Sequence, residues 1–142
     1  MIYMETIDTA LVGIYRPPAS FSDPSRRCPP DHFQACLEQV ESFLKEHIPG
    51  NILLTGDFNF PMVNWDTLEL KTGTNTLATE RQSAELLISL TERLFLQQIV
   101  LEPTRMDKNV LDLVFTNNEL LIHDVDVIKT EWSDHDLVKV TL

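Results

Sequence analysis

The sequence predicts an α/β protein built in layers, with a single domain over residues 1–142. Short runs rich in β-branched and aromatic residues alternate with two amphipathic stretches of helical period in the first two thirds of the chain. The later runs follow one another with no helix between them, so we expect antiparallel pairing there. A chain of 142 residues, 43% of them apolar, is also long enough to enclose a hydrophobic core.

The N-terminal third is expected to contain two strands and a helix. The stretch "METIDTALVGIYRPP" predicts two short extended runs around Asp8, and the Pro-Pro pair at 17–18 ends the second run. A polar, proline-rich loop is expected over residues 19–30. Residues 31–47 have helical periodicity, with a Pro-Asp start signal before them and a Pro-Gly stop signal after them. The predicted apolar face of this helix consists of Phe33, Cys36, Leu37, Val40, Phe43 and Leu44.

The next part of the chain is expected to continue with a strand, a loop and a second helix. The apolar run "NILLTG", residues 51–56, predicts a short buried strand, and a long polar loop is expected from Phe58 to about Thr79. The second helix is predicted over residues 80–95. Its predicted apolar face consists of Ala84, Leu87, Ile88, Thr91, Leu94 and Phe95. Short strands are predicted after it, at 97–100, 111–116, 125–130 and 136–142.

The net charge of −11 argues against a protein that holds nucleic acid mainly through its own cations. Arg26 and Arg27 form the only adjacent pair of cations in the sequence. A nuclease can still be acidic, because metal ions bring positive charge to the phosphate. The longest uncharged apolar run is too short to span a membrane, and no targeting leader opens the chain, so a soluble intracellular protein is expected.

The two cysteines, Cys28 and Cys36, lie eight positions apart. Neither has a histidine or another cysteine at the spacing of a zinc site. We therefore expect free thiols in a reducing compartment rather than a disulfide.

Polar residues gather at the ends of four predicted strands, where α/β sheets commonly place their sites. They are Tyr15 with Arg16, Asp57 with Asn59, Asp112, and the run "WSDHD" at 132–136. Each has a structural interpretation as well. Asp57 and Asn59 are common turn-formers, Tyr15 suits a strand core, and the acidic run suits a surface turn.

The functional interpretation of these residues is acid–base chemistry on a phosphate. Asp57 could orient or deprotonate a water while Asn59 holds the nucleophile or the phosphate. Asp112 interrupts an apolar strand, where a carboxylate needs a hydrogen bond, a histidine or a metal as its partner. His135 could contact a phosphoryl oxygen as a cation, with its other ring nitrogen held by Asp112.

Four motifs occur in a recognisable order: "IYRPP", "LLTGDFNFP" with Trp65 after it, "PTR" ahead of "NVLDLVFTN", and "SDHDLV". Together they resemble the endonuclease/exonuclease/phosphatase superfamily, and within it the endonuclease domain of LINE-type, non-LTR retrotransposons. The resemblance runs from about residue 10 to the last residue. It implies a DNase I-like fold, in which two β-sheets form a sandwich with helices outside. It also implies hydrolysis of DNA phosphodiesters that depends on Mg²⁺ or Mn²⁺.

The resemblance implies a catalytic role for five residues. Tyr15 matches the tyrosine that contacts phosphate. Asp57 matches the acid that aligns or activates the attacking water, and Asn59 matches the amide that helps to position it. Asp112 matches the acid that pairs with the catalytic histidine, which is His135.

Three further positions follow from the same resemblance. Asp134 matches the acid beside the catalytic histidine, close to the metal. Arg105 of "PTR" is expected to bind substrate together with Tyr15 and Asn59, and Ser133 is expected to form a structural hydrogen bond. Mg²⁺ prefers oxygen ligands and retains waters, so a few carboxylates and amides suffice.

The superfamily pattern includes two more residues before the tyrosine motif, an asparagine on the first strand and a metal-binding glutamate. Glu5 lies ten positions before Tyr15, too close to match that glutamate, and is expected on an ordinary strand. The chain is therefore expected to be an N-terminally truncated, partial domain with impaired activity. Its open sheet edge and exposed inner face are expected to cause self-association.

Three functions remain open at this level. The first is a retrotransposon-type nicking endonuclease, and the second is a catalytically inactive remnant or interaction module of the same fold. The third, a phosphatase of the superfamily, is disfavoured by the "PTR" and "LDLVFTN" motifs. Weak binding to DNA, no membrane association and a nuclear location are expected from the resemblance and the composition.

Overall fold

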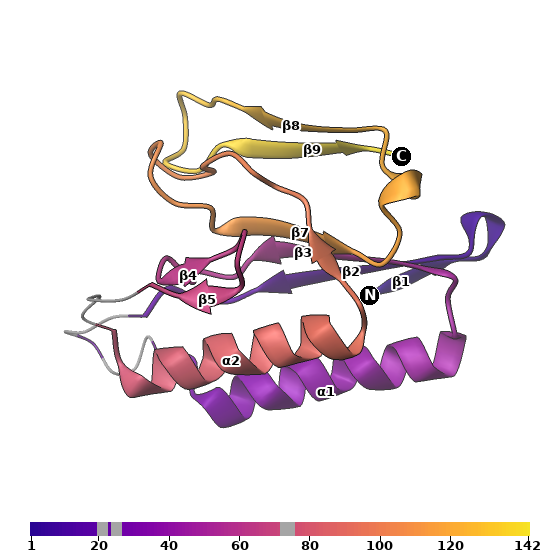
Figure 1. Ribbon diagram of the computed structural model, residues 1–142, viewed down its shortest axis with the longest axis horizontal. Coiled ribbons are helices and arrows are strands. Elements are labelled where there is room, and N and C mark those ends of the chain that lie inside the picture. Colours follow the sequence, from indigo (N-terminus) through magenta and orange to yellow (C-terminus); the bar gives the residue numbers. More distant parts are fainter. Residues whose placement is uncertain (20–22, 24–26, 72–75) are drawn as a thin grey trace.

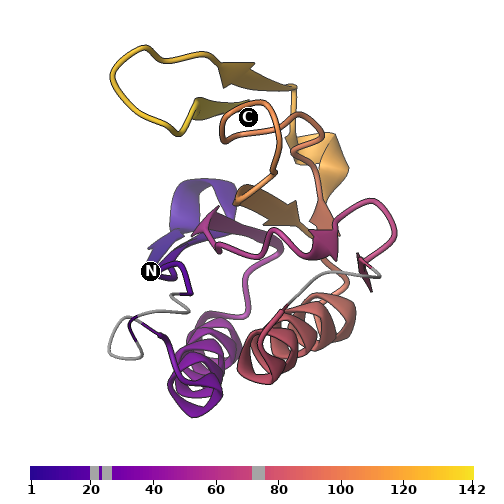
Figure 2. The same ribbon diagram turned by 90° about the vertical axis from the view of Figure 1, so that its left-hand side faces the viewer.

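A central β-sheet separates two helices from a β-hairpin, which gives the fold three layers (Figure 1). The computed structural model describes residues 1–19, 23, 27–71 and 76–142. Figure 2 shows the two helices side by side on one face of the sheet and the hairpin on the other. Parts of the two predicted loops lie outside the described residues, as does Arg26. The mixed α/β architecture predicted from the sequence is confirmed.

The central sheet has the strand order β1-β2-β3-β7-β6. The strands are β1 (Ile2–Met4), β2 (Thr9–Tyr15), β3 (Asn51–Asp57), β6 (Gln97–Gln98) and β7 (Asp112–Thr116). β2 and β3 are parallel and joined by a helical crossover, whereas the other neighbours are antiparallel. The pairing of β2 with β3 runs from Thr9 opposite Asn51 to Tyr15 opposite Asp57, so both strands end together. The strand predicted at 97–100 is reduced to the two residues of β6.

The helix α1 (Pro30–His47) covers one face of this sheet. Proline suits its first turn because the missing N–H would have no partner there. The helix ends where Ile48 takes a left-handed conformation with φ 47°. Its buried side chains are Phe33, Leu37, Val40 and Leu44, which lie on a single face. The predicted helix at 31–47 is confirmed to within one residue.

The helix α2 (Ala78–Arg93) lies beside α1 and starts and ends two residues earlier than predicted. It ends before Phe95, which takes a left-handed conformation with φ 53°. Phe95 is 85% exposed, so its predicted place on the apolar face is wrong. The buried face of α2 instead begins with a charged residue, Glu80, in the first turn.

The segment after β3 is not the polar surface loop that the sequence predicted. Its buried apolar side chains are Phe58, Phe60, Met62, Val63 and Trp65. The segment forms a small sheet of β4 (Val63–Asn64) and β5 (Glu69–Leu70). Phe58 and Trp65 each pack edge-on against Phe115, with ring centroids 5.7 Å apart. The prediction failed because the polar and turn-forming residues Asn59, Pro61 and Asn64 separate these apolar side chains and make the segment resemble a loop.

The hairpin of β8 (Asp124–Ile128) and β9 (Leu137–Thr141) covers the second face of the sheet. Leu53 and Val114 are buried beneath it. Partly buried side chains that pack there include Leu11, Val125, Val127, Val138 and Val140. The inner face was expected to be exposed, and this is wrong where the hairpin packs. Self-association remains a prediction.

The turn between β1 and β2 lies at the opposite end of the sheet from Tyr15. It consists of the 3-10 turn η1 (Glu5–Ile7) and Asp8, which has a left-handed φ of 46°. Glu5 therefore lies in a turn, not on the strand that was expected for it. Within the described ranges, no helix is long and apolar enough to cross a membrane.

Candidate active site

Three predicted site residues lie side by side where their strands meet at one end of the sheet. The pairing places Tyr15 opposite Asp57, and Asp57 opposite Asp112. Side chains alternate along a strand, so Asp57 lies on the same face as Leu53, and Asp112 on the same face as Val114. That face is the one covered by the hairpin. The register of the sheet thus brings the three side chains to one end of the space between sheet and hairpin.

His135 reaches the same place from the other layer, in the loop that leads into β9. Its main chain is held at both polar groups: its N–H donates to Ser133 Oγ at 3.0 Å, and its carbonyl accepts from Thr130 Oγ1 at 2.7 Å. The ring is held by Asp112, whose Oδ2 lies 2.8 Å from His135 Nδ1. The hydrogen bond that the resemblance implied is therefore present, as is the structural role expected for Ser133.

Asp57, Asp112 and His135 form a group able to hold a metal ion. One ligand atom from each lies within 4.8 Å of the others, and all three side chains are half-buried. Two carboxylates and an imidazole are donors that Mn²⁺ accepts, and the carboxylates suit Mg²⁺. Asp57 and Asp112 come from the sheet and His135 comes from the hairpin layer, so the group links the two layers.

The electrostatics of this group favour a cation beside Asp57. Burial raises the pKa of the Asp57 carboxyl, and the negative charge of Asp112 raises it further. The charge of His135 and hydrogen bonding from Asn59 act in the opposite direction. Two acids side by side repel each other when both are ionised, and a cation between them relieves that repulsion.

The "GDFN" turn holds Asn59 and Asp57 in a fixed relation. Asn59 is 5% exposed and left-handed, with φ 51°. Its N–H donates to Asp57 Oδ1 at 3.1 Å, and its Nδ2 donates to the Arg16 carbonyl at 2.8 Å. Gly56, the first residue of this turn, has φ 147°, and a Cβ there would lie 1.7 Å from the Ile14 carbonyl oxygen. Glycine is therefore required at this position.

Two of the predicted residues, Asp134 and Arg105, bind each other rather than joining this group. Arg105 Nη2 lies 2.7 Å from Asp134 Oδ2, and Arg105 Nε lies 2.9 Å from the same atom. The guanidinium lowers the pKa of the Asp134 carboxyl. Their roles in metal and substrate binding stay predictions. Tyr15 is 71% exposed beside Asp57, where a substrate could reach its hydroxyl.

Thr104 is a site residue to which none of the four motifs assigns a role. It is fully buried, and its Oγ1 accepts hydrogen bonds from the main-chain N–H groups of Leu111 and Asp112, each at 3.0 Å. Its carbonyl accepts from the Asp136 N–H at 2.8 Å. Thr104 therefore fixes both the start of β7 and the chain just after His135. The "PTR" motif was its only signal in the sequence.

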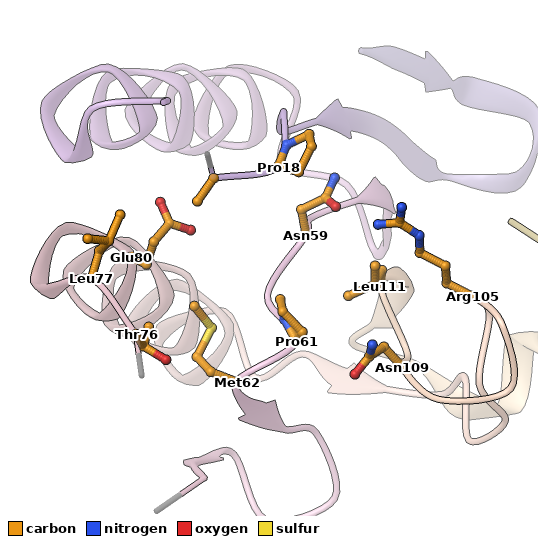
Figure 3. A pocket seen from close by; sticks show the side chains of 11 residues that line it. Pro18, Asn59, Pro61, Met62, Thr76, Leu77, Glu80, Arg105, Asn109 and Leu111 are labelled. Atoms are coloured by element: carbon orange, nitrogen blue, oxygen red, sulfur yellow. The ribbon is translucent and has the colours of Figure 1, made fainter. Parts of the chain in front are cut away.

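A second buried contact that the sequence did not reveal is the ion pair of Arg16 with Glu80. Glu80, with Asn59 and Arg105, lines a cavity of about 270 Å³ next to the "GDFN" turn. Figure 3 shows Glu80 and Arg105 on opposite sides of this cavity, with Asn59 between them. The remaining wall is largely apolar, and includes Pro61, Met62 and Leu111.

A family model described as endonuclease-reverse transcriptase matches residues 9–139. The chain belongs to this family. It is therefore an endonuclease/exonuclease/phosphatase-type domain of retrotransposon kind, as the four motifs predicted. A comparison with curated proteins gave no match. The part of the endonuclease domain that matches begins at the first residue of β2 and ends within β9, so it includes every predicted site residue.

Replacing Asp57 by asparagine is expected to stabilise this endonuclease domain at neutral pH when divalent cations are absent. The pKa of Asp57 is raised in the folded state, so its ionisation costs stability above the unfolded-state pKa, and the full cost applies above the folded-state pKa. Because water screens this half-exposed site, we expect Tm to rise by roughly 1–4 °C at pH 7. The gain should vanish at a pH below about 3, where the carboxyl is largely neutral in both states.

Thermal melts in EDTA at both pH values measure this difference. Asp126→Asn is the matched control, since Asp126 lies on β8 and pairs with Lys139 outside the site. A gain from Asp57→Asn that persists at low pH would show that the charge of Asp57 is not its cause.

Proposed function

We propose that this domain is a metal-dependent endonuclease that nicks DNA by hydrolysing a phosphodiester. The observation that carries the proposal is the convergence of Asp57, Asp112 and His135 at one end of the sheet. Membership of the endonuclease-reverse transcriptase family supports nuclease chemistry over phosphatase chemistry.

The donor atoms of the site fit a hard divalent cation such as Mg²⁺ or Mn²⁺. Asp57 would be its principal ligand. Burial and the neighbouring Asp112 carboxylate make the negative charge of Asp57 unfavourable, and a bound cation would offset that charge. Asp134, next to His135 in the chain, is the further ligand that the resemblance implies. A bound cation would polarise the phosphoryl oxygen and offset the negative charge that develops on it.

The chain's own residues would align the water and the phosphate. Asp57 would align the attacking water and accept its proton, the role that the resemblance implies for this acid. Asn59, held in place by Arg16, would keep the water or the phosphate in line. His135, with Nδ1 bound to Asp112, would direct Nε2 at a phosphoryl oxygen. Tyr15 would donate its hydroxyl to the phosphate from the adjacent strand.

We further propose that the fold is a DNase I-like sandwich and that turnover is low. The sheet and the hairpin face each other across a shared core, which supports two sheets packed together. Within the described part of the chain, the metal-binding group contains no glutamate. Three protein ligands leave the other coordination positions of the cation to water, so weak binding and slow turnover are expected of this group.

Nicking of supercoiled plasmid tests this proposal, and the reaction is expected to depend on added Mg²⁺ or Mn²⁺. We expect a slow conversion to open circles at millimolar Mg²⁺, abolished by EDTA and restored by excess metal. Asp57→Asn, prepared in parallel, controls for a contaminating nuclease. Equal nicking by wild type and variant, or nicking that survives EDTA, would contradict the assignment. A folded protein with no nicking in either metal would favour the inactive remnant instead.

A further inference from the structure

Arg16 and Glu80 form a buried ion pair that links the end of β2 to the first turn of α2. Arg16 Nη2 lies 2.5 Å from Glu80 Oε1, and the two side chains are 1% and 4% exposed. The guanidinium also lies over the Phe60 ring, 4.3 Å from its centroid. Among the residues that the structure describes, Arg16 Nε and Nη1 have no hydrogen-bond partner. Burial of this pair is costly, so stability alone does not account for it.

The main chain of Arg16 is bound to the catalytic turn on both sides. Its N–H donates to the Asp57 carbonyl at 2.8 Å. Its carbonyl accepts from Asn59 Nδ2, also at 2.8 Å. A shift of Arg16 would therefore move the group that holds the Asn59 amide. Figure 3 shows that Glu80 and Asn59 line the same cavity, so the two ends of this chain of contacts lie close together.

We propose that the Arg16–Glu80 pair positions Asn59 for the reaction, and this inference rests on the proposed nuclease function. Glu80 belongs to α2, a rigid element, and fixes the guanidinium through one short hydrogen bond. The guanidinium in turn fixes the backbone of Arg16, whose carbonyl holds the Asn59 amide. Both members of the pair are positioning residues, because they act on the substrate only through Asn59. A planar guanidinium forms hydrogen bonds in fixed directions, which an apolar side chain of similar volume cannot do.

The decisive experiment replaces the whole pair with apolar residues in the double variant Arg16→Met/Glu80→Leu. Removing both charges from a buried pair is often neutral for stability or favourable, so we expect a Tm within a few degrees of the wild type. The structural readout is hydrogen exchange at the Asn59 side-chain amide, followed by NMR. We expect this exchange to be at least about 10-fold faster in the double variant, because the bond to Arg16 is no longer held in place.

Nicking kinetics give a second readout. A small displacement of a positioning group mainly lowers the rate of the chemical step. We therefore expect kcat to fall by about 10–100-fold with KM nearly unchanged. The matched control is Arg93→Met/Glu41→Leu, which removes an exposed Arg–Glu pair between α2 and α1. This control should change neither Asn59 exchange nor kcat.

Unchanged Asn59 exchange in a stable double variant would overturn the proposal, whatever the nicking assay gives. Absence of nicking by the wild type would contradict the proposed function instead and leave the exchange measurement to decide this inference. If the double variant does not fold, Glu80→Met serves in its place, since it keeps the length of the side chain and removes the hydrogen-bond acceptor. Faster Asn59 exchange in that variant supports the positioning role, and unchanged exchange overturns it.

Discussion

His135→Ala is expected to slow plasmid nicking by roughly 10²–10⁴-fold, the range lost with a positioned acid–base group. Only the ring contacts Asp112, with Nδ1 2.8 Å from Oδ2, and alanine removes that contact. The hydrogen bonds that hold residue 135 in its loop come from its main chain, so they survive the substitution. The fold should therefore persist while the group directed at the phosphate is lost.

His123→Ala is the matched control for this substitution. His123 is exposed, and its N–H pairs with the Thr141 carbonyl in the same hairpin layer. We expect this variant to nick at the wild-type rate and His135→Ala to melt close to the wild-type temperature. If both variants lost activity equally, damage to the hairpin rather than loss of the His135 ring would be the explanation.

Thr104→Val is expected to lower the free energy of unfolding by about 2–5 kcal/mol, although valine has nearly the same shape. The lost hydroxyl is the acceptor for the N–H groups of Leu111 and Asp112, each at 3.0 Å. Each of these N–H groups would then lack a partner, at a cost of about 1–3 kcal/mol when buried. Nicking should fall as well, because Asp112 begins the strand that these bonds hold.

Thr91→Val provides a control of the same chemistry at equal burial. Thr91 is 1% exposed, but its hydroxyl donates to the Ile88 carbonyl inside α2, where its loss leaves no buried N–H without a partner. Its cost should be below about 1 kcal/mol. Urea denaturation of both variants measures the difference. Equal costs would show that the Thr104 bonds contribute nothing beyond burial of a hydroxyl.

The helices and the order of the site residues could be predicted because their signals are local. A single apolar face predicted α1 within one residue, and the four motifs pointed to the family of this chain. The strand ends also indicated where polar residues would gather. The register of β3 and β7 then places Asp57 opposite Asp112, a step that the sequence order alone could not supply.

The features that could not be predicted depend on contacts between distant parts of the chain. The helical period predicts the place of Glu80 in α2 but not its pairing with Arg16, 64 residues away. Thr104 has no distinguishing neighbour in the sequence, because its role arises from the folding of residues 109–112 back over it. The irregular apolar segment 58–65 appeared polar and loop-like, yet packs into the core beside Phe115.

The candidate site is divided between the central sheet and the hairpin, and His135 meets Asp112 only across the space between them. If the proposed function holds, a chain in which the hairpin is undocked lacks His135, and the sheet keeps Asp57 and Asp112 without it. The proposed nuclease activity would then depend on docking of the hairpin as well as on folding of the sheet, and an incompletely folded chain would not hydrolyse a phosphodiester.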